Sequence, residues 1–346
     1  MAKLCRIEQA IGEERAAVIH RKRDIEYYVR RESEAGIARK GDVFSGRVKR
    51  IDKDLMAAFV DLDNGESGLL RFAMTPGAPR LVEGAMIRAT VLRQGETGKA
   101  ALLKFIEPSD AKTPIKEKSS SLREAISARY PGIKFEDGHV NGIEAVAETE
   151  VALQGGGYIY IEHTRAGTMI DVDTGTGQKS EVGMTAAREI SRQIRRRGIG
   201  GLILIDFPNF RKRKIKADVW QTFKDGFNDD PDMPKIAPWS RFGTIEMTRT
   251  RRGPTIAQIL LGPDGSPTAE TQALAGLRRL TTEAEIDGGA RLVLQVPNDA
   301  FAWLENGVIN WREALSGRIG QRFRVVSGKT TDVYKDDVKD DVKDDV

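Results

Sequence analysis

Two aspartates, Asp171 and Asp206, are the residues of this sequence whose type and spacing best suit joint chemistry. Asp171 lies near the end of the apolar segment 168–172, and Asp206 follows the strongly apolar segment 202–205, 35 residues farther along the chain. Both segments have the pattern of strands, and the residues between them recur at helical spacing. Two central strands joined through a helix can lie side by side in one sheet. The spacing therefore allows the two carboxylates to converge.

The chemistry open to such a pair depends on its surroundings. Two buried carboxylates repel each other, so they require a cation or a shared proton. A hard divalent ion such as Mg²⁺ or Mn²⁺ prefers oxygen ligands, and it can activate water and offset negative charge on a phosphodiester. From the spacing alone, two solvated carboxylates at strand ends are the simpler interpretation. The metal site is a hypothesis that needs further support.

Basic residues crowd around the second aspartate. Nine Lys or Arg lie between residues 192 and 216, and Asp206 is the only acid among them. Arg249, Arg251 and Arg252 add further positive charge. Basic residues around a few acids are the pattern expected of a metal site that acts on a polyanion. The alternative for each arginine is a solvated helix face.

The composition agrees with a soluble protein that binds a polyanion. The 346 residues contain 55 Lys and Arg against 51 Asp and Glu, a net charge of +4. Residues 332–346 hold seven Asp and three Lys, which leaves the rest of the chain at +8. One Cys and three His exclude a disulfide framework and disfavour a Cys- or His-based metal site. No stretch suits a membrane span or a signal peptide, so we expect a cytoplasmic protein.

Residues 36–106 show the pattern of a small closed barrel, with short strands broken by Gly and Asp turns. The stretch GDVFSGRVKRIDKDLMAAFVDLDNGESGLL resembles the OB-fold RNA-binding domain of the ribosomal-protein-S-one type. Such barrels stack bases of single strands on aromatic rings and follow the backbone with cations. Phe44 and Phe59 are the candidate rings, although a place in the barrel core is an equal alternative for either one. The candidate phosphate contacts are Arg47, Lys49, Arg50 and Lys99.

Three sequence blocks follow the barrel in a fixed order. They read GGGYIYIEHTRAGTMIDVDTG, RRRGIGGLILIDFPNF and WSRFGTIEMTRTR. Together they resemble the catalytic core of the ribonuclease E/G family of endoribonucleases. The first is similar to the family's IDIN-type metal motif, the second to its GGLIVIDFIDM strand and the third to its SRFGLLEMSRQR segment. With the barrel and the amino-terminal block, the similarity covers most of residues 5–330.

The resemblance implies a role for each matching residue. Asp171 and Asp206 would hold the catalytic Mg²⁺, with Mn²⁺ as an alternative. Asp173 stands where the family usually has Asn, and it either adds a third carboxylate to the site or faces water in a loop. Arg241 matches the family arginine near the scissile phosphate, where a guanidinium neutralises developing charge. Arg249 would contact RNA or support that segment.

The resemblance also implies an order of domains, of fold class α/β plus β-barrel. An OB-fold domain at 36–106 would be inserted in a shortened RNase H-like region at 1–35 and 107–150. In that region, prolines and the run KEKSSS suggest a linker, followed by a helix at 122–130. A DNase I-like catalytic domain would occupy 151–262 and a small α/β domain 263–328. Residues 329–346 would form a disordered acidic tail that resembles an epitope tag.

Two departures from the family limit what carries over. The region between the barrel and residue 150 is too short to supply the family's pocket for a 5′-monophosphate. The CPxC zinc-link motif should follow Arg252, but the sequence there has no Cys, so we expect no zinc and no zinc-linked dimer. A homo-oligomer through the small domain stays an option.

The implied reaction is metal-assisted hydrolysis of single-stranded RNA, in RNA processing such as rRNA maturation or in decay. It would leave a 5′-phosphate and a 3′-hydroxyl. The lack of a suitable histidine pair argues against attack by the RNA's own 2′-hydroxyl. A non-catalytic RNA-binding protein on the same scaffold is the main alternative. A phosphodiesterase acting on DNA is a third, and the RNA-type barrel argues against it.

Overall fold

A computed structural model of the chain describes residues 3–63, 65–74, 80–95 and 99–336. These residues divide into two units, each with its own packed interior. The first unit contains residues 3–6, 16–28 and 36–257, and the second contains 7–15, 29–35 and 258–336. The architecture is mixed α/β with a separate barrel, which agrees at that level with the expected fold class.

Five strands close the barrel of the first unit. They are joined in the order β4-β5-β6-β8-β7, and β7 pairs back to β4. β6 and β8 run parallel, whereas the other pairs are antiparallel. This arrangement is OB-like and confirms the closed barrel expected from the sequence. The strands are β4 (Val43–Asp52), β5 (Ala57–Asp61), β6 (Ser67–Arg71), β7 (Met86–Arg93) and β8 (Ala101–Pro108), with a short 3-10 helix at Phe72–Met74.

The barrel sheet extends beyond residue 106, where a linker was expected. β8 continues past that point, and β9 (Ile115–Lys118) pairs antiparallel with β4. The carboxylate of Glu117 accepts hydrogen bonds from Ser45 and Arg88 on the barrel. Proline and serine content indicated a linker, but the polar side chains of β9 find partners on the barrel, so that expectation was wrong.

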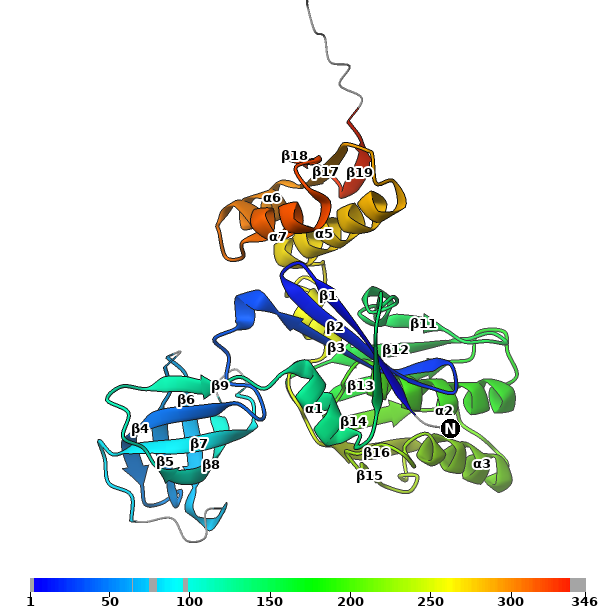
Figure 1. Cartoon of the computed structure of the whole chain (residues 1–346). Helices are drawn as coiled ribbons and strands as arrows, with labels where there is room; N and C mark the ends of the chain where they lie inside the picture. Colours follow the sequence, from blue (N-terminus) through cyan, green and yellow to red (C-terminus); the bar gives the residue numbers. More distant parts are fainter. Residues whose placement is uncertain (1–2, 64, 75–79, 96–98, 337–346) are drawn as a thin grey trace, which may run out of the picture. The chain divides into compact units, whose positions relative to one another are not determined.

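A six-stranded sheet forms the α/β part of the first unit, and helices α2 and α3 cover one of its faces (Figure 1). The strand order is β11-β12-β13-β14-β16-β15, in which β13 and β14 run parallel and the other pairs are antiparallel. The strands are β11 (Glu150–Ala152), β12 (Tyr158–His163), β13 (Thr168–Asp173), β14 (Gly201–Asp206), β15 (Lys235–Ile236) and β16 (Thr244–Arg249). The helices are α2 (Lys179–Arg196) and α3 (Arg213–Asp225).

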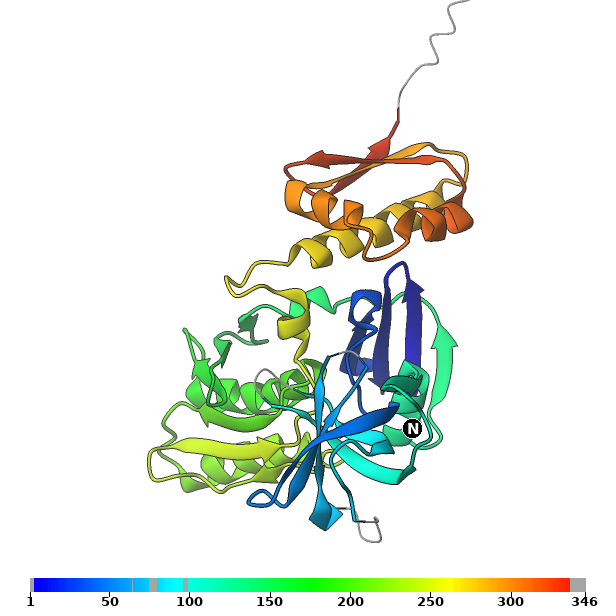
Figure 2. The same ribbon diagram turned by 90° about the vertical axis from the view of Figure 1, so that its left-hand side faces the viewer.

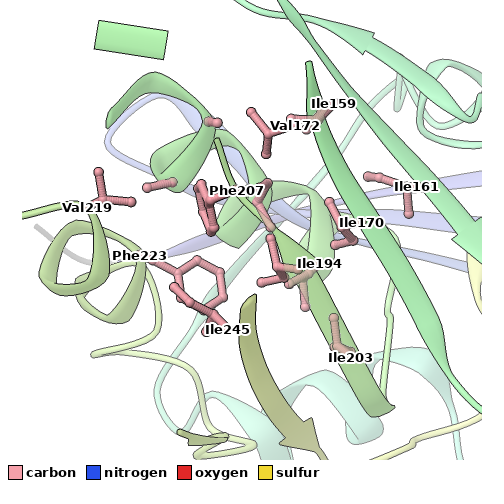
Figure 3. Packing of buried hydrophobic residues seen from close by; sticks show 14 of the residues in the cluster. Ile159, Ile161, Ile170, Val172, Ile194, Ile203, Phe207, Val219, Phe223 and Ile245 are labelled. Atoms are coloured by element: carbon pink, nitrogen blue, oxygen red, sulfur yellow. The ribbon is translucent and has the colours of Figure 1, made fainter. Parts of the chain in front are cut away.

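Alternation of apolar residues decides which face the helices cover. Ile170 and Val172 of β13 are buried beneath the helices. Ile203 and Ile205 of β14 are buried in the same layer, where Ile194 of α2 packs against the sheet (Figure 3). Because successive side chains of a strand point to opposite faces, the residues between these isoleucines point away from the helices.

A separate four-stranded sheet has the order β10-β1-β2-β3. Its strands are β1 (Leu4–Ala10), β2 (Glu13–His20), β3 (Arg23–Arg31) and β10 (Lys134–Asp137), with 3-10 helices at Glu32–Glu34 and Glu144–Val146. Helix α1 (Leu122–Arg129) begins at a capping box, in which Ser121 Oγ accepts from the Glu124 N–H at 3.0 Å and the Glu124 carboxylate accepts from the Ser121 N–H at 2.9 Å. The helix expected at 122–130 is confirmed.

The second unit contains the small α/β module. Its helices α5, α6 and α7 lie on one side of a three-stranded sheet of order β18-β17-β19 (Figure 2). Leu274, Leu294 and Trp311 lie in its buried core. Among the residues described, no helix is both long and apolar enough to cross a bilayer. The elements are α4 (Ile256–Leu260), α5 (Ala269–Ile286), β17 (Leu292–Pro297), α6 (Asn298–Glu305), α7 (Trp311–Ile319), β18 (Phe323–Gly328) and β19 (Asp332–Lys335).

The start of the expected disordered tail is part of this module. β19 pairs antiparallel with β17, and Val333 packs against the core. The expectation of disorder from residue 329 was therefore wrong for residues 332–335. The composition there is acidic, but one apolar side chain and a free strand edge on β17 are enough to order the segment. The remaining tail, 337–346, lies outside the described residues.

Candidate active site on the open face of the sheet

The uncovered face of the six-stranded sheet carries the two aspartates that the sequence singled out. Asp171 of β13 and Asp206 of β14 are both exposed on it. We call this surface the open face. It comprises Tyr158, Tyr160, Met169, Asp171, Asp173, Leu202, Leu204, Asp206, Glu246 and Thr248.

The register of the two parallel strands brings the aspartates together. Asp171 is the direct partner of Asp206. Neighbouring strands lie about 4.8 Å apart, so the two carboxylates project from adjacent points of the same face. Within the described part of the chain, neither side chain has a hydrogen-bond or ion-pair partner. The convergence expected from the strand–helix–strand pattern is confirmed, and both carboxylates are available to a ligand.

Asp173, two residues beyond Asp171, has a different environment. Its Oδ1 accepts a hydrogen bond from the Gly175 N–H at 2.8 Å. One oxygen therefore stabilises the turn that leaves β13, while the side chain remains exposed. Asp173 lies on the same face as Asp171, but one of its two carboxylate oxygens is already used by a hydrogen bond within the turn.

Arg241 lies in the turn that leads into β16, the strand next to β14. Thr244, the first residue of β16, is the register partner of Asp206. Ser240 Oγ accepts the N–H groups of Phe242 and Thr244 at 3.2 Å each, and it lies 2.7 Å from Thr244 Oγ1. The turn is thus anchored at the strand that flanks Asp206. Arg241 and Phe242 are exposed at its tip, and the Phe242 side chain is 93% exposed.

The residues present fit a hydrated divalent ion better than a fully enclosed one. Among the described residues, no group of three or more His, Cys, Asp or Glu is arranged to hold a metal ion. Mg²⁺ is usually held by one or two carboxylates and retains several waters, which leaves places for substrate phosphate oxygens. Two adjacent exposed carboxylates without protein partners, Asp171 and Asp206, meet that requirement.

Arg249, expected to contact RNA, is buried instead. Only 3% of the residue is exposed. Its Nε donates to Asp230 Oδ2 at 2.7 Å and its Nη1 to the Ile199 carbonyl at 2.9 Å. The alternation of β16 puts it on the same side as Ile245 and Met247, which belong to the core. The burial contradicts the expected contact with RNA and agrees with the alternative, in which Arg249 supports its segment.

Arginines near the end of α2 are also engaged in the interior. Arg195 Nη1 donates to Asp229 Oδ1 at 2.5 Å, and Arg197 Nη1 donates to the Glu148 carbonyl at 2.6 Å. Burial lowers the pKa of Arg197 to about 10, with a further contribution from the charge of Arg196. These members of the basic cluster are structural.

Four other cations of the basic cluster lie in solvent. They are found where the loop that leaves β14 after Asp206 leads into α3. Within the described residues, none of the four side chains makes an ion pair or a side-chain hydrogen bond. The sequence cluster therefore divides into buried arginines of α2 and unpaired cations at the start of α3. These cations are Arg211, Lys212, Arg213 and Lys214.

Of the two candidate rings in the barrel, Phe44 is not available for stacking. It is fully buried in the barrel core with Val48, Leu70 and Leu103. Of the two alternatives for Phe44, the place in the barrel core is confirmed and stacking on a base is not, because the alternation of β4 points the ring inward.

Phe59 is half-buried, and the Arg50 guanidinium lies over its ring at 4.6 Å from the centroid. Lys49 and Lys99 are exposed. Arg47 donates to the Lys112 carbonyl at 2.7 Å, so it is partly used within the barrel.

The aromatic side chains beside the aspartates were missed by the sequence reasoning. Tyr158 and Tyr160 lie on the open face, and Phe242 lies at the tip of the Arg241 turn. A signal was present in the sequence, because the run Tyr-Ile-Tyr-Ile alternates between two kinds of side chain, as the strand of the metal motif also does. It could be used only once the faces of both strands were known.

Comparison with known proteins identifies relatives of this region. Residues 110–252 match the Ribonuclease E/G family. A protein named Ribonuclease E from Nostoc sp. is 35% identical over 125 residues, which cover 34% of this chain and 18% of that protein. Ribonuclease E from Synechocystis sp. is 34% identical over 149 residues, 41% of this chain and 22% of that protein. Ribonuclease G from Escherichia coli is 30% identical over 128 residues, 35% of this chain and 26% of that protein.

The matched segment contains the site residues described above. Asp171, Asp206 and Arg241 all lie within 110–252. The chain spans about a quarter or less of the length of these three relatives. The similarity therefore concerns the sheet with the open face and its surroundings.

Proposed function

We propose that the chain is an endoribonuclease that cleaves single-stranded RNA with the help of Mg²⁺, because residues 110–252 match the Ribonuclease E/G family. The observation that carries the proposal is the direct pairing of Asp171 with Asp206 on an exposed face, with Arg241 on the adjoining turn. The products would carry a 5′-phosphate and a 3′-hydroxyl.

The chain's own residues would divide the work as follows. Asp171 and Asp206 would hold the ion, next to which the scissile phosphate would lie. When bound there, the ion supplies Lewis-acid activation of water and of the phosphate. Arg241, on a turn fixed by Ser240, donates to phosphate oxygens as negative charge grows on them. Asp173 stabilises the turn and adds negative charge that favours a cation at the pair.

Binding of the RNA chain would rest on two positively charged surfaces. The exposed cations at the start of α3 follow Asp206 by a few residues and offer unpaired charges to phosphates. On the barrel, Phe59, Lys49 and Lys99 provide one ring and two cations of the kind that OB-like domains use for single strands.

A cleavage assay with matched variants tests the proposal. The substrate is a short, unstructured A/U-rich RNA in Mg²⁺. Asp206→Asn and Asp171→Asn keep the size of the side chains but remove a charged ligand, so we expect cleavage to fall by at least about a hundredfold. Asp218→Asn, an exposed aspartate on α3, is the control and should cleave like the unmodified protein. Removing Mg²⁺ with EDTA should stop cleavage reversibly.

Two results would contradict the proposal. Undiminished cleavage by Asp206→Asn would rule out the aspartate pair as the metal site. Tight RNA binding without cleavage in either Mg²⁺ or Mn²⁺ would establish the rival, a non-catalytic RNA-binding protein. End-labelling of the products decides the polarity of cleavage, and a 2′,3′-cyclic phosphate would rule out hydrolysis by water.

A further inference from the structure

Strand β12 places two tyrosines on the open face. Ile159 and Ile161 are buried under the helices, so Tyr158 and Tyr160 point to the opposite side. Tyr158 is 39% exposed and Tyr160 is half-buried. Large aromatic rings bury more apolar area than almost any other side chain when they are covered, so two neighbouring exposed rings are a candidate binding surface.

The register puts these rings directly beside the carboxylates. Tyr160 pairs with Asp171, and Tyr158 pairs with Asp173. Directly opposed side chains of an antiparallel pair have Cβ atoms about 5 Å apart. Since Asp171 in turn pairs with Asp206, the three side chains Tyr160, Asp171 and Asp206 form one row across adjacent strands.

The rings of Tyr158 and Tyr160 lie near each other but are not stacked. Their centroids are 6.4 Å apart and their planes are tilted by 32°. Partial desolvation and the nearby carboxylate of Glu150 raise the pKa of Tyr160.

We propose that Tyr158 and Tyr160 form a stacking platform for the nucleobases next to the phosphodiester held at Asp171 and Asp206. The inference rests on the proposed ribonuclease function and names the part of the substrate that this surface takes. Sheet faces with exposed aromatic rings bind single-stranded RNA in this manner, with bases laid on the rings and the backbone free to reach neighbouring polar groups.

Charge favours RNA over a protein as the occupant of this platform. A protein interface over the tyrosines would also cover Asp171 and Asp173, because each of these carboxylates is the direct register partner of one ring. Burying unpaired carboxylates is costly. A single strand of RNA can instead place bases on the rings and leave its phosphates at a cation held by the aspartates.

The platform should act on substrate binding more than on the chemical step. Base stacking forms equally in the ground state and the transition state, so its loss raises KM and leaves kcat nearly unchanged. It should also tolerate any base, because every base has a π-face.

The test measures binding separately from cleavage. All variants are made in the Asp206→Asn background, and the probe is a fluorescein-labelled A/U-rich single-stranded RNA read by anisotropy. We expect Tyr158→Ala and Tyr160→Ala each to weaken binding by roughly five- to a hundredfold, the range that corresponds to one stacked base. Tyr160→Phe keeps the ring and should bind normally. Met169→Ala, an exposed open-face residue that pairs with Glu162 and not with a tyrosine, is the matched control.

An abasic scan distinguishes stacking from a general loss of structure. Removing one base at a time from the probe should weaken binding at one or two positions. At those positions, Tyr158→Ala and Tyr160→Ala should cause little further loss. Equal losses with intact and abasic RNA would overturn the proposal, as would normal binding by both alanine variants. A changed sedimentation coefficient with unchanged RNA affinity would show that the face binds protein instead.

The readouts also separate this proposal from the one on which it rests. If the protein with Asp206 intact binds RNA through the tyrosines but does not cleave it, the platform stands and the ribonuclease function fails. If it cleaves normally after both tyrosines are replaced, the function stands and the platform fails.

Discussion

At the residue scale, a buried ionic cluster includes Arg249, one of the cations that the sequence suggested for RNA binding. Glu26 of β3 accepts from Arg129 Nη2 at 2.8 Å, and Arg129 also pairs with Asp230 at 3.0 Å. Arg249 joins the same cluster through Asp230 and through Asp232 at 2.9 Å. Breaking one partner of such a cluster leaves an uncompensated buried charge.

Glu26 is the centre of a prediction about acid stability. Burial alone would raise its pKa, but the charges of Arg252 and Arg129 hold the pKa well below its ordinary value of 4.5. The folded state therefore binds this proton less readily than the unfolded state. The stabilisation is complete at neutral pH, and it is lost progressively as the pH falls below about 4.5 towards the depressed pKa.

Glu26→Gln should thus lower the free energy of unfolding by about 3–5 kcal/mol at pH 7 and flatten its decline below pH 5. Denaturant unfolding from pH 7 to pH 3 measures both effects. Glu181→Gln, at an exposed position in the first turn of α2, is the control and should cost less than about 1 kcal/mol. Equal acid sensitivity in Glu26→Gln and the unmodified protein would contradict the assignment.

At the element scale, the packing of α2 on the loop after β14 supports the site. Gly183 lies in the buried face of α2, and a Cβ there would come within 2.8 Å of Phe210 Cε1 and closer still to Cζ. Phe210 is buried, packs edge-on against Trp239 at 6.1 Å, and directly precedes the exposed cations that lead into α3. The absence of a side chain at Gly183 therefore helps to set the course of this loop.

Gly183→Ala is expected to destabilise the protein by about 1–3 kcal/mol, although alanine favours helix by about 1 kcal/mol. The crowding against Phe210 should outweigh the propensity. Gly317→Ala in α7, where an added Cβ meets nothing within 4 Å, is the matched control and should stabilise by about 0.5–1 kcal/mol. Denaturant unfolding of both variants decides the sign, and stabilisation by Gly183→Ala would show that the ring moves aside freely.

At the scale of the whole molecule, local placement of charge matters more than the net charge of +4. Part of the basic excess is neutralised within the fold, as at Arg129, Arg195 and Arg249. The unpaired cations at the start of α3 are therefore expected to dominate the electrostatic attraction of RNA.

Salt dependence measures this directly. For single strands, log K falls with log[salt] by about 0.7 per phosphate contact, so neutralising four contacts should reduce the slope by about three. The test variant replaces the four cations at the start of α3 with glutamine. Its control neutralises four exposed arginines of the small module and should leave the slope nearly unchanged. Equal effects in both would mean that binding follows net charge. The two sets are Arg211, Lys212, Arg213 and Lys214, and Arg279, Arg312, Arg318 and Arg324.

The sequence by itself determined the elements and the pairing of the two aspartates. The strands at 158–163, 168–173 and 201–206 and the helix between them follow from apolar periodicity, which is local. The closed barrel follows from its short strands and turns in the same way. A parallel strand–helix–strand unit has few possible arrangements, so the convergence of Asp171 and Asp206 could be predicted.

Only the tertiary structure decided which side chains reach solvent. Arg249 is buried because Asp230, from another part of the unit, neutralises it, and Phe44 is buried because β4 turns that ring into the barrel. The tyrosines of β12 lie beside the carboxylates because two strands share one register and one open face. The burial of a side chain and its ion pairs depend on partners distant in sequence, and local patterns carry no information about those partners.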